Sequence, residues 1–173
     1  MIENFKIAVI GSGTMGNGIA HTAAQSGFKT LLVDINQAQL DKALSTIDKN
    51  LDRQVNKEII SQSDKQQILN NISLGTNMNS CKEMDLVIEA IPEKYDLKVS
   101  VFKDLDSICK KSTILASNTS SISISNLGNQ TKRPDKIIGM HFMNPVPIMK
   151  LVEVINTFHT SKETTQVIID ISK

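Results

Sequence analysis

The chain has 173 residues, a length that suits one domain with a substantial core. Its formal net charge is +1, and it has neither a basic run nor an aromatic platform, which argues against nucleic acid as a partner. No apolar stretch approaches the length of a bilayer and no charged leader precedes the first strand, so we expect no membrane association and a cytoplasmic location.

Residues 6–34 carry a glycine-rich turn between a strand and a helix. The segment reads KIAVIGSGTMGNGIAHTAAQSGFKTLLVD, in which two apolar runs flank a helix-forming stretch. Gly11 permits a sharp turn, Gly13 leaves space for a pyrophosphate, and Gly16 lets the helix pack closely against the sheet. The helix that begins near Thr14 would direct its free N–H groups and positive dipole end at the phosphates.

Asp34 follows the second apolar run, about 20 residues beyond the glycines, where a carboxylate can accept hydrogen bonds from both hydroxyls of an adenosine ribose. Neither Ile35 nor Asn36 offers the cation that a 2′-phosphate would need, so the pattern predicts NAD rather than NADP. A glycine-rich turn without a ligand is the alternative. The order of strand, glycines, helix, strand and Asp favours the dinucleotide site.

Two helices are predicted after Asp34. Residues 38–55 are polar except for one stripe at helical spacing, formed by Leu40, Ala43, Leu44, Ile47 and Leu51. Ser63 and Gln66 have the spacing of a capping box, which predicts a second helix that runs to about Leu69. The two helices would be an insertion relative to a minimal nucleotide-binding unit.

Four further strands are predicted at residues 85–91, 113–117, 136–142 and 151–155. Helices are expected after the first and the last of these strands. The first is marked by Leu97, Val101, Leu105 and Ile108 at the 3.6 period. The second is expected to be capped by Thr160 with Glu163. This alternation predicts an α/β fold of the Rossmann type, a doubly wound and mostly parallel sheet with a helical insertion.

The last helix has an apolar stripe of Val167, Ile168 and Ile171 that is still in progress at Lys173. We therefore expect residues 1–173 to form a single domain that is incomplete at its C-terminal end. The two cysteines, Cys81 and Cys109, belong to no CxxC or Cys/His cluster, so we expect buried or half-buried thiols and no metal site.

Polar residues interrupt the second half of the predicted sheet. Glu153 lies in the middle of an apolar strand, where a carboxylate is costly unless it is paired. His141 ends the neighbouring strand, and a Glu bonded to one imidazole nitrogen would leave the other free as a base. Taken alone, His141 could be an ordinary strand histidine and Glu153 an edge residue facing water. The segments 117–121 (SNTSS) and 144–145 (NP) also follow strands, so their polar groups could gather at the ligand side of the sheet.

The chain resembles the 3-hydroxyacyl-CoA dehydrogenases, which include the bacterial 3-hydroxybutyryl-CoA dehydrogenases. The matching segments are GSGTMGNGIA, VIEAIPE, LASNTSSISI and GMHFMNPVPIMKLVEVI, which occur in the family's order along essentially the whole chain. The resemblance implies an NAD-dependent oxidoreductase that interconverts 3-hydroxyacyl-CoA and 3-ketoacyl-CoA, with a short-chain substrate such as 3-hydroxybutyryl-CoA, in fatty acid or butanoate metabolism.

The resemblance also assigns roles to particular residues. His141 would be the general base and Glu153 its orienting partner, while Ser120 and Asn144 would hydrogen-bond the substrate oxygen. The cofactor would be bound by the residues Gly11, Gly13, Thr14, Met15, Gly16, Asp34, Glu93 and Lys98. The CoA part of the substrate would meet Lys57, Ser120 and Asn50, the last of which replaces a serine that is common in the family.

Members of the family continue into an all-helical domain that supplies the dimer interface, another catalytic Asn and a wall of the acyl pocket. That domain is missing from these 173 residues. We therefore expect a homodimer only when it is present, and negligible activity from residues 1–173 alone. Two alternatives stay open: a non-catalytic NAD-binding module, and a 3-hydroxyacid dehydrogenase that acts on free acids.

Overall fold

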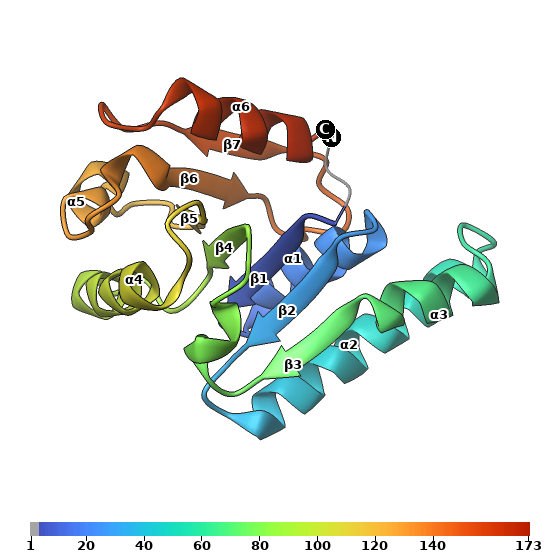
Figure 1. The fold of residues 1–173 in the computed structure, drawn as a ribbon. Coiled ribbons are helices and arrows are strands. Elements are labelled where there is room, and N and C mark those ends of the chain that lie inside the picture. The colour runs from blue at the N-terminus through green and yellow to red at the C-terminus, as the bar shows by residue number, and fades with distance from the viewer. Residues whose placement is uncertain (1–3) are drawn as a thin grey trace.

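The computed structural model describes residues 4–173 and has the predicted α/β fold. Seven strands form one sheet in the order β3-β2-β1-β4-β5-β6-β7 (Figure 1). Their bounds are β1 Lys6–Ile10, β2 Lys29–Val33, β3 Ile72–Gly75, β4 Leu86–Glu89, β5 Ile114–Ser117, β6 Ile137–Phe142 and β7 Val152–Ile155. All neighbours pair in parallel except β6 and β7, which are antiparallel. The sheet is therefore mostly parallel, as predicted.

Helices cover both faces of the sheet (Figure 1). The α-helices are α1 Thr14–Gln25, α2 Gln37–Asn56, α3 Gln62–Asn70, α4 Tyr95–Ile108, α5 Ile124–Gly128 and α6 Lys162–Ile171, and the short 3-10 helices are η1 Met78–Cys81 and η2 Pro134–Lys136. One core cluster joins the sheet to α1, α2 and α6 through residues such as Ile19, Leu40 and Ile168. A second core cluster on the opposite face joins it to α4 and α5 through Phe102 and Leu127. The fold is therefore doubly wound.

The strand order places the candidate site. β1 pairs with β2 on one side and with β4 on the other, so the chain crosses between the two faces of the sheet at this point. Loops that follow β1 and β4 diverge there and leave a crevice at the carboxyl ends of the strands.

Four expectations about local structure are wrong. The sequence pattern gave six strands and missed β3, because this four-residue edge strand contains Ser73 and ends in Gly75 instead of showing an apolar run. The capping box at the start of α3 is formed by Ser61 and Asp64, not by Ser63 and Gln66.

At α6 the cap is Ser161, whose side chain accepts a hydrogen bond from Thr164 N–H. Thr160 instead donates from its hydroxyl to the carbonyl oxygen of Ile137 at 2.7 Å, which ties the start of α6 to β6. On α4, Leu97 is 43% exposed and does not belong to the buried stripe, whereas Lys98 is buried.

Over residues 4–173 no helix is long and apolar enough to cross a membrane.

His21 is a fully buried histidine on α1, and within the described residues its ring nitrogens have no hydrogen-bond partner. Burial lowers the pKa of His21 below its ordinary value, and the nearby Gln25 side chain offsets only part of this effect. His21 is therefore harder to protonate in the folded chain than in the unfolded chain, where its pKa is near 6.5.

We expect this histidine to make folding pH-dependent. Stability should be fully present above about pH 6.5 and should fall as the pH drops toward the lowered pKa, by at most about 1.4 kcal/mol per pH unit for one proton. Urea unfolding at pH 7.5 and pH 5.5 measures the loss, which should shrink in His21→Leu. The exposed His159 supplies the matched control, and an equal effect of His159→Leu would contradict this assignment.

Candidate active site

His141 and Glu153 face each other across the last two strands of the sheet. They occupy directly opposite positions in the antiparallel register of β6 and β7. His141 Nδ1 lies 2.7 Å from Glu153 Oε2, and the two side chains are 25% and 53% exposed. Glu153, which was expected to need a partner, therefore has one. It lies on β7, an edge strand of the sheet that is open to solvent. The second ring nitrogen of His141 is left for another contact.

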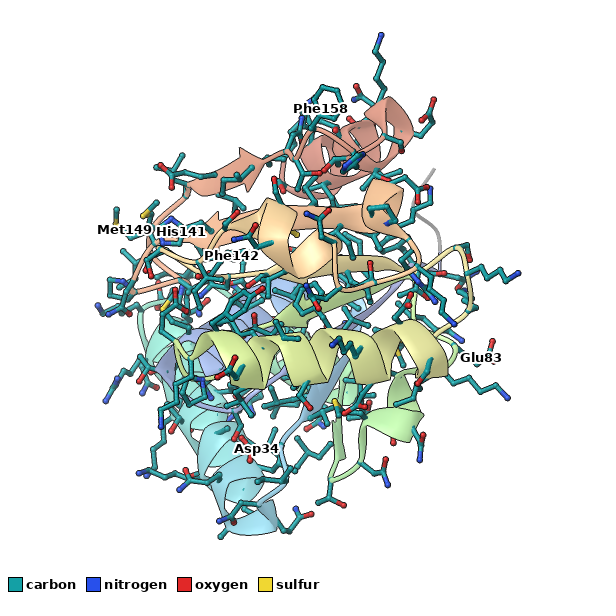
Figure 2. The ribbon with its side chains drawn as sticks, turned by 90° about the vertical axis from the view of Figure 1, so that its left-hand side faces the viewer. Asp34, Glu83, His141, Phe142, Met149 and Phe158 are labelled. Atoms are coloured by element: carbon teal, nitrogen blue, oxygen red, sulfur yellow. The ribbon has the colours of Figure 1, made fainter. Side chains whose placement is uncertain are left out.

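A cavity of about 380 Å³ opens beside His141 at the carboxyl ends of the strands. Figure 2 shows His141 and Phe142 on one side of the view and Glu83 at the opposite side. The cavity brings together six of the predicted site residues, namely His141, Ser120, Asn144, Glu93, Lys98 and Met15. Residues that are distant in the sequence therefore line one space.

The glycine turn has the shape that a dinucleotide requires. Gly11 has a φ of +98°, and a Cβ atom there would lie 2.7 Å from the Ala90 carbonyl oxygen. At Gly16 a Cβ would lie 1.8 Å from the Gly11 carbonyl oxygen, so the third glycine serves the close approach of helix and turn. A Cβ at Gly13 would meet nothing within 4 Å, and no side chain caps the α1 N-terminus. The open backbone there fits the pyrophosphate of a dinucleotide.

Asp34 lies at the end of β2 and is bonded to the glycine turn. Its Oδ2 accepts hydrogen bonds from the Ser12 N–H at 2.8 Å and the Ser12 hydroxyl at 2.7 Å. Partial burial opposes ionisation, but these bonds and that from Asn36 N–H outweigh it and lower the pKa of Asp34 below its ordinary value. Asp34 therefore presents a negative charge beside the turn. Ser12 was not predicted as a site residue, because only the glycines on either side of it belong to the sequence motif.

Glu93 holds the loop that carries Ser120. Its Oε1 accepts hydrogen bonds from the Ser120 and Ser121 N–H groups, each at 3.2 Å, and from the hydroxyls of Ser121 and Thr119. Burial opposes ionisation, yet the hydrogen bonds from Thr119 and Lys98 and the positive charge of Lys98 lower the pKa of Glu93 to about 2. The SNTSS segment is thus anchored on an ionised carboxylate.

Glu89 is a buried residue of the site that sequence reasoning missed. Its carboxylate accepts hydrogen bonds from Ile91 N–H at 2.8 Å, the Ser117 hydroxyl at 2.6 Å and Lys98 Nζ at 2.6 Å. A carboxylate at the end of the apolar run LVIE was the available signal, since the rule that a buried Glu needs a partner applies to Glu89 as it does to Glu153.

The residues expected at CoA are not all in one place. Asn50 lies in a second groove of about 380 Å³, which runs between α2, the glycine turn and the loop from Asn144 to Pro147. Lys57, the C-terminal cap residue of α2, is exposed and lines neither this groove nor the cavity beside His141. Asn144 lines both spaces and so connects them.

Known proteins are similar to this chain along nearly its whole length. The sequence model of the family described as 3-hydroxyacyl-CoA dehydrogenase, NAD binding domain, matches residues 6–173. The 3-hydroxybutyryl-CoA dehydrogenase of Clostridioides difficile is 51% identical over 97% of this chain and 60% of its own length. The probable 3-hydroxybutyryl-CoA dehydrogenase of Bacillus subtilis strain 168 is 45% identical over 94% of this chain and 57% of its own length.

A solved structure is also similar. The crystal structure of (S)-3-hydroxybutyryl-CoA dehydrogenase from Ralstonia eutropha superimposes with a TM-score of 0.94 at 44% identity, covering 96% of this chain and 59% of that chain. The fold and the glycine turn define a nucleotide-binding domain of the Rossmann type. The chain belongs to the 3-hydroxyacyl-CoA dehydrogenase family and corresponds to its NAD-binding domain. It spans about 60% of the length of these relatives.

Asp34 should set the choice of cofactor. A carboxylate held ionised beside the glycine turn repels the 2′-phosphate of NADPH, so NADH should bind at least about tenfold more tightly than NADPH. Asp34→Ala should narrow the difference in Kd between NADH and NADPH, and isothermal titration calorimetry with each cofactor measures it. Asp104→Ala, which removes an exposed charge from α4, is the control and should leave the gap unchanged. Equal or tighter binding of NADPH by the wild type would contradict the role given to Asp34.

Proposed function

We propose that the protein is an NAD-dependent 3-hydroxyacyl-CoA dehydrogenase, which oxidises the C3 hydroxyl of a 3-hydroxyacyl-CoA and catalyses the reverse reduction. The observation that carries the proposal is that His141, paired with Glu153, lines a cavity together with Ser120, Asn144 and Met15 at the start of α1. When bound, the nicotinamide supplies a hydride acceptor. The protein groups must then bind the substrate and move a proton.

His141 is suited to take the proton of the C3 hydroxyl. Glu153 bonds to Nδ1, which fixes the proton of the neutral imidazole there and leaves Nε2 as the acceptor. As the imidazole becomes positively charged, the Glu153 carboxylate stabilises it. Proton removal can therefore accompany the loss of hydride from C3.

Ser120 and Asn144 are the candidates for orienting the substrate oxygen. Both line the cavity with His141, and both come from loops that follow strands. The Ser120 N–H donates to Glu93 Oε1 at 3.2 Å, which fixes the backbone at the residue whose hydroxyl would meet the substrate. A hydroxyl and an amide placed in this way can hydrogen-bond an oxygen that is an alcohol in one direction and a carbonyl in the other.

A short acyl chain is part of the proposal, and so is a role in fatty acid or butanoate metabolism. The support is the naming of relatives at 51% and 45% identity as enzymes of 3-hydroxybutyryl-CoA. The proposed CoA contacts are Asn50 in the second groove and Lys57 at the end of α2, about 10 Å apart along the helix. An extended ligand could meet both residues.

The class of substrate is tested directly. Oxidation of 3-hydroxybutyryl-CoA and of free 3-hydroxybutyrate is followed by NADH absorbance, with a chain in which the family's helical domain follows residues 1–173. We expect turnover of the thioester only. Turnover of the free acid would favour a 3-hydroxyacid dehydrogenase, and NAD binding without turnover of either would favour a binding module.

In a chain that also contains the family's helical domain, His141→Gln should lower kcat by roughly 10²–10⁴-fold, the usual contribution of a positioned acid–base group. The Kd of NAD should barely change, because His141 contacts the substrate. His159→Gln removes a histidine from the loop after β7 and should leave kcat unchanged. Near-normal turnover by His141→Gln would remove His141 from the mechanism.

Glu153→Gln keeps the shape of the side chain and removes the charge that stabilises the imidazolium. We expect kcat to fall by about tenfold or more and its pH dependence to change, with little effect on KM. Steady-state kinetics between pH 5.5 and pH 9 measure both effects. An unchanged pH profile would show that Glu153 does not act through His141.

A further inference from the structure

Three charged residues lie in and behind the wall of the cavity: Glu89, Lys98 and Glu93, which we call the charged trio. Lys98 Nζ lies 2.6 Å from Glu89 Oε1 and 3.1 Å from Glu93 Oε2. The side chains of Glu89 and Lys98 are 0% and 1% exposed, whereas that of Glu93 is 39% exposed. Lys98 and Glu93 line the cavity, and Glu89 lies behind Lys98 without lining it.

The charged trio carries one excess negative charge. Three donors converge on Glu89, which matches the acceptor-only carboxylate form. Glu93 is ionised at neutral pH, because the hydrogen bonds and the Lys98 charge described above outweigh its burial. Two carboxylates therefore share one ammonium group.

The excess negative charge of the charged trio attracts a cation. Glu89 and Lys98 form a buried pair without net charge, so the unbalanced carboxylate is that of Glu93, which is 39% exposed and lines the cavity. Within residues 4–173, the ion pairs of the charged trio involve no other Lys or Arg. The His141 imidazolium is already paired with Glu153 at 2.7 Å. The remaining place for a positive group is the cavity itself.

We propose that Glu89, through Lys98, makes the cavity wall negative and so favours the oxidised, cationic form of the nicotinamide cofactor relative to the reduced, neutral form. This inference rests on the proposed function, which places a nicotinamide in this cavity. The two forms of the cofactor differ by one unit of charge on the ring, and buried charges are weakly screened by salt. Glu89 acts through another residue and is a positioning residue.

Glu89→Gln tests the inference, because the substitution keeps the size of the side chain and leaves the charged trio neutral. The ratio of the Kd of NAD⁺ to the Kd of NADH should rise by roughly three- to tenfold, as expected for one charge in a partly buried setting. Isothermal titration calorimetry of the protein with each form gives the ratio without any need for turnover.

Asp106→Asn is the matched control. Asp106 pairs with Arg133 at 2.7 Å, both side chains are largely buried, and neither lines the cavity beside His141. This variant should also lower the melting temperature, but it should leave the Kd ratio unchanged. If a melting curve shows that the Glu89→Gln variant is unfolded, Glu93→Gln replaces it. This substitution removes one negative charge from a side chain that is 39% exposed, and it must raise the Kd ratio similarly.

Equal weakening of both forms by Glu89→Gln would indicate a structural role only and overturn the proposal. An unchanged ratio with an altered pH dependence of turnover would also overturn it and assign the charge to His141. The proposed function fails separately, if a wild-type chain that includes the family's helical domain binds both forms yet turns over no thioester. In that case the Kd ratio still decides the role of Glu89.

Discussion

The parallel pairing of β4 with β1 is the constraint on which the rest of the site depends. It places Glu89 opposite Ile10 in the register, directly beside the strand that leads into the glycine turn. Gly11 can make that turn only because it has no Cβ to meet the Ala90 carbonyl oxygen. The dinucleotide turn and the buried carboxylate are therefore two consequences of the same pair of strands.

From this pair the site extends outward through hydrogen bonds to carboxylate and amide oxygens. Glu89 bonds to Ser117 at the end of β5, and Asn118 Oδ1 accepts a hydrogen bond from Phe142 N–H at 2.9 Å, which connects β5 to the end of β6. His141 then bonds to Glu153 on β7. Each strand end is tied to the next one, so the loops that carry Ser120 and Asn144 start from fixed positions.

Much of this could be predicted from the sequence, because the glycine spacing, the apolar runs and the charge at Asp34 are local signals. The fold class and the candidate residues of the cavity came from such signals and from the family resemblance. The edge strand β3 has no apolar run, so its pairing with β2 had no local signal. The sequence pattern also could not indicate that Lys98, and not Leu97, is the buried residue of α4. Lys98 is buried because Glu89 and Glu93 neutralise its charge. Sequence periodicity assigns a lysine to solvent.

The antiparallel pairing of β7 makes the His141–Glu153 pair dependent on strand register. Side chains alternate between the two faces of a strand, so a slip of β7 by one residue would turn Glu153 to the opposite face. Such a slip would separate the pair without unfolding the domain. Two features oppose it: α6 packs against β6 and β7, and a Cβ at Gly139 would lie 2.8 Å from the Ile155 Cβ. Ile155 packs against Gly139, which has no side chain, and this fit opposes a change of register. Each of these two residues lies two positions from a member of the proposed acid–base pair, so packing next to the pair keeps it aligned.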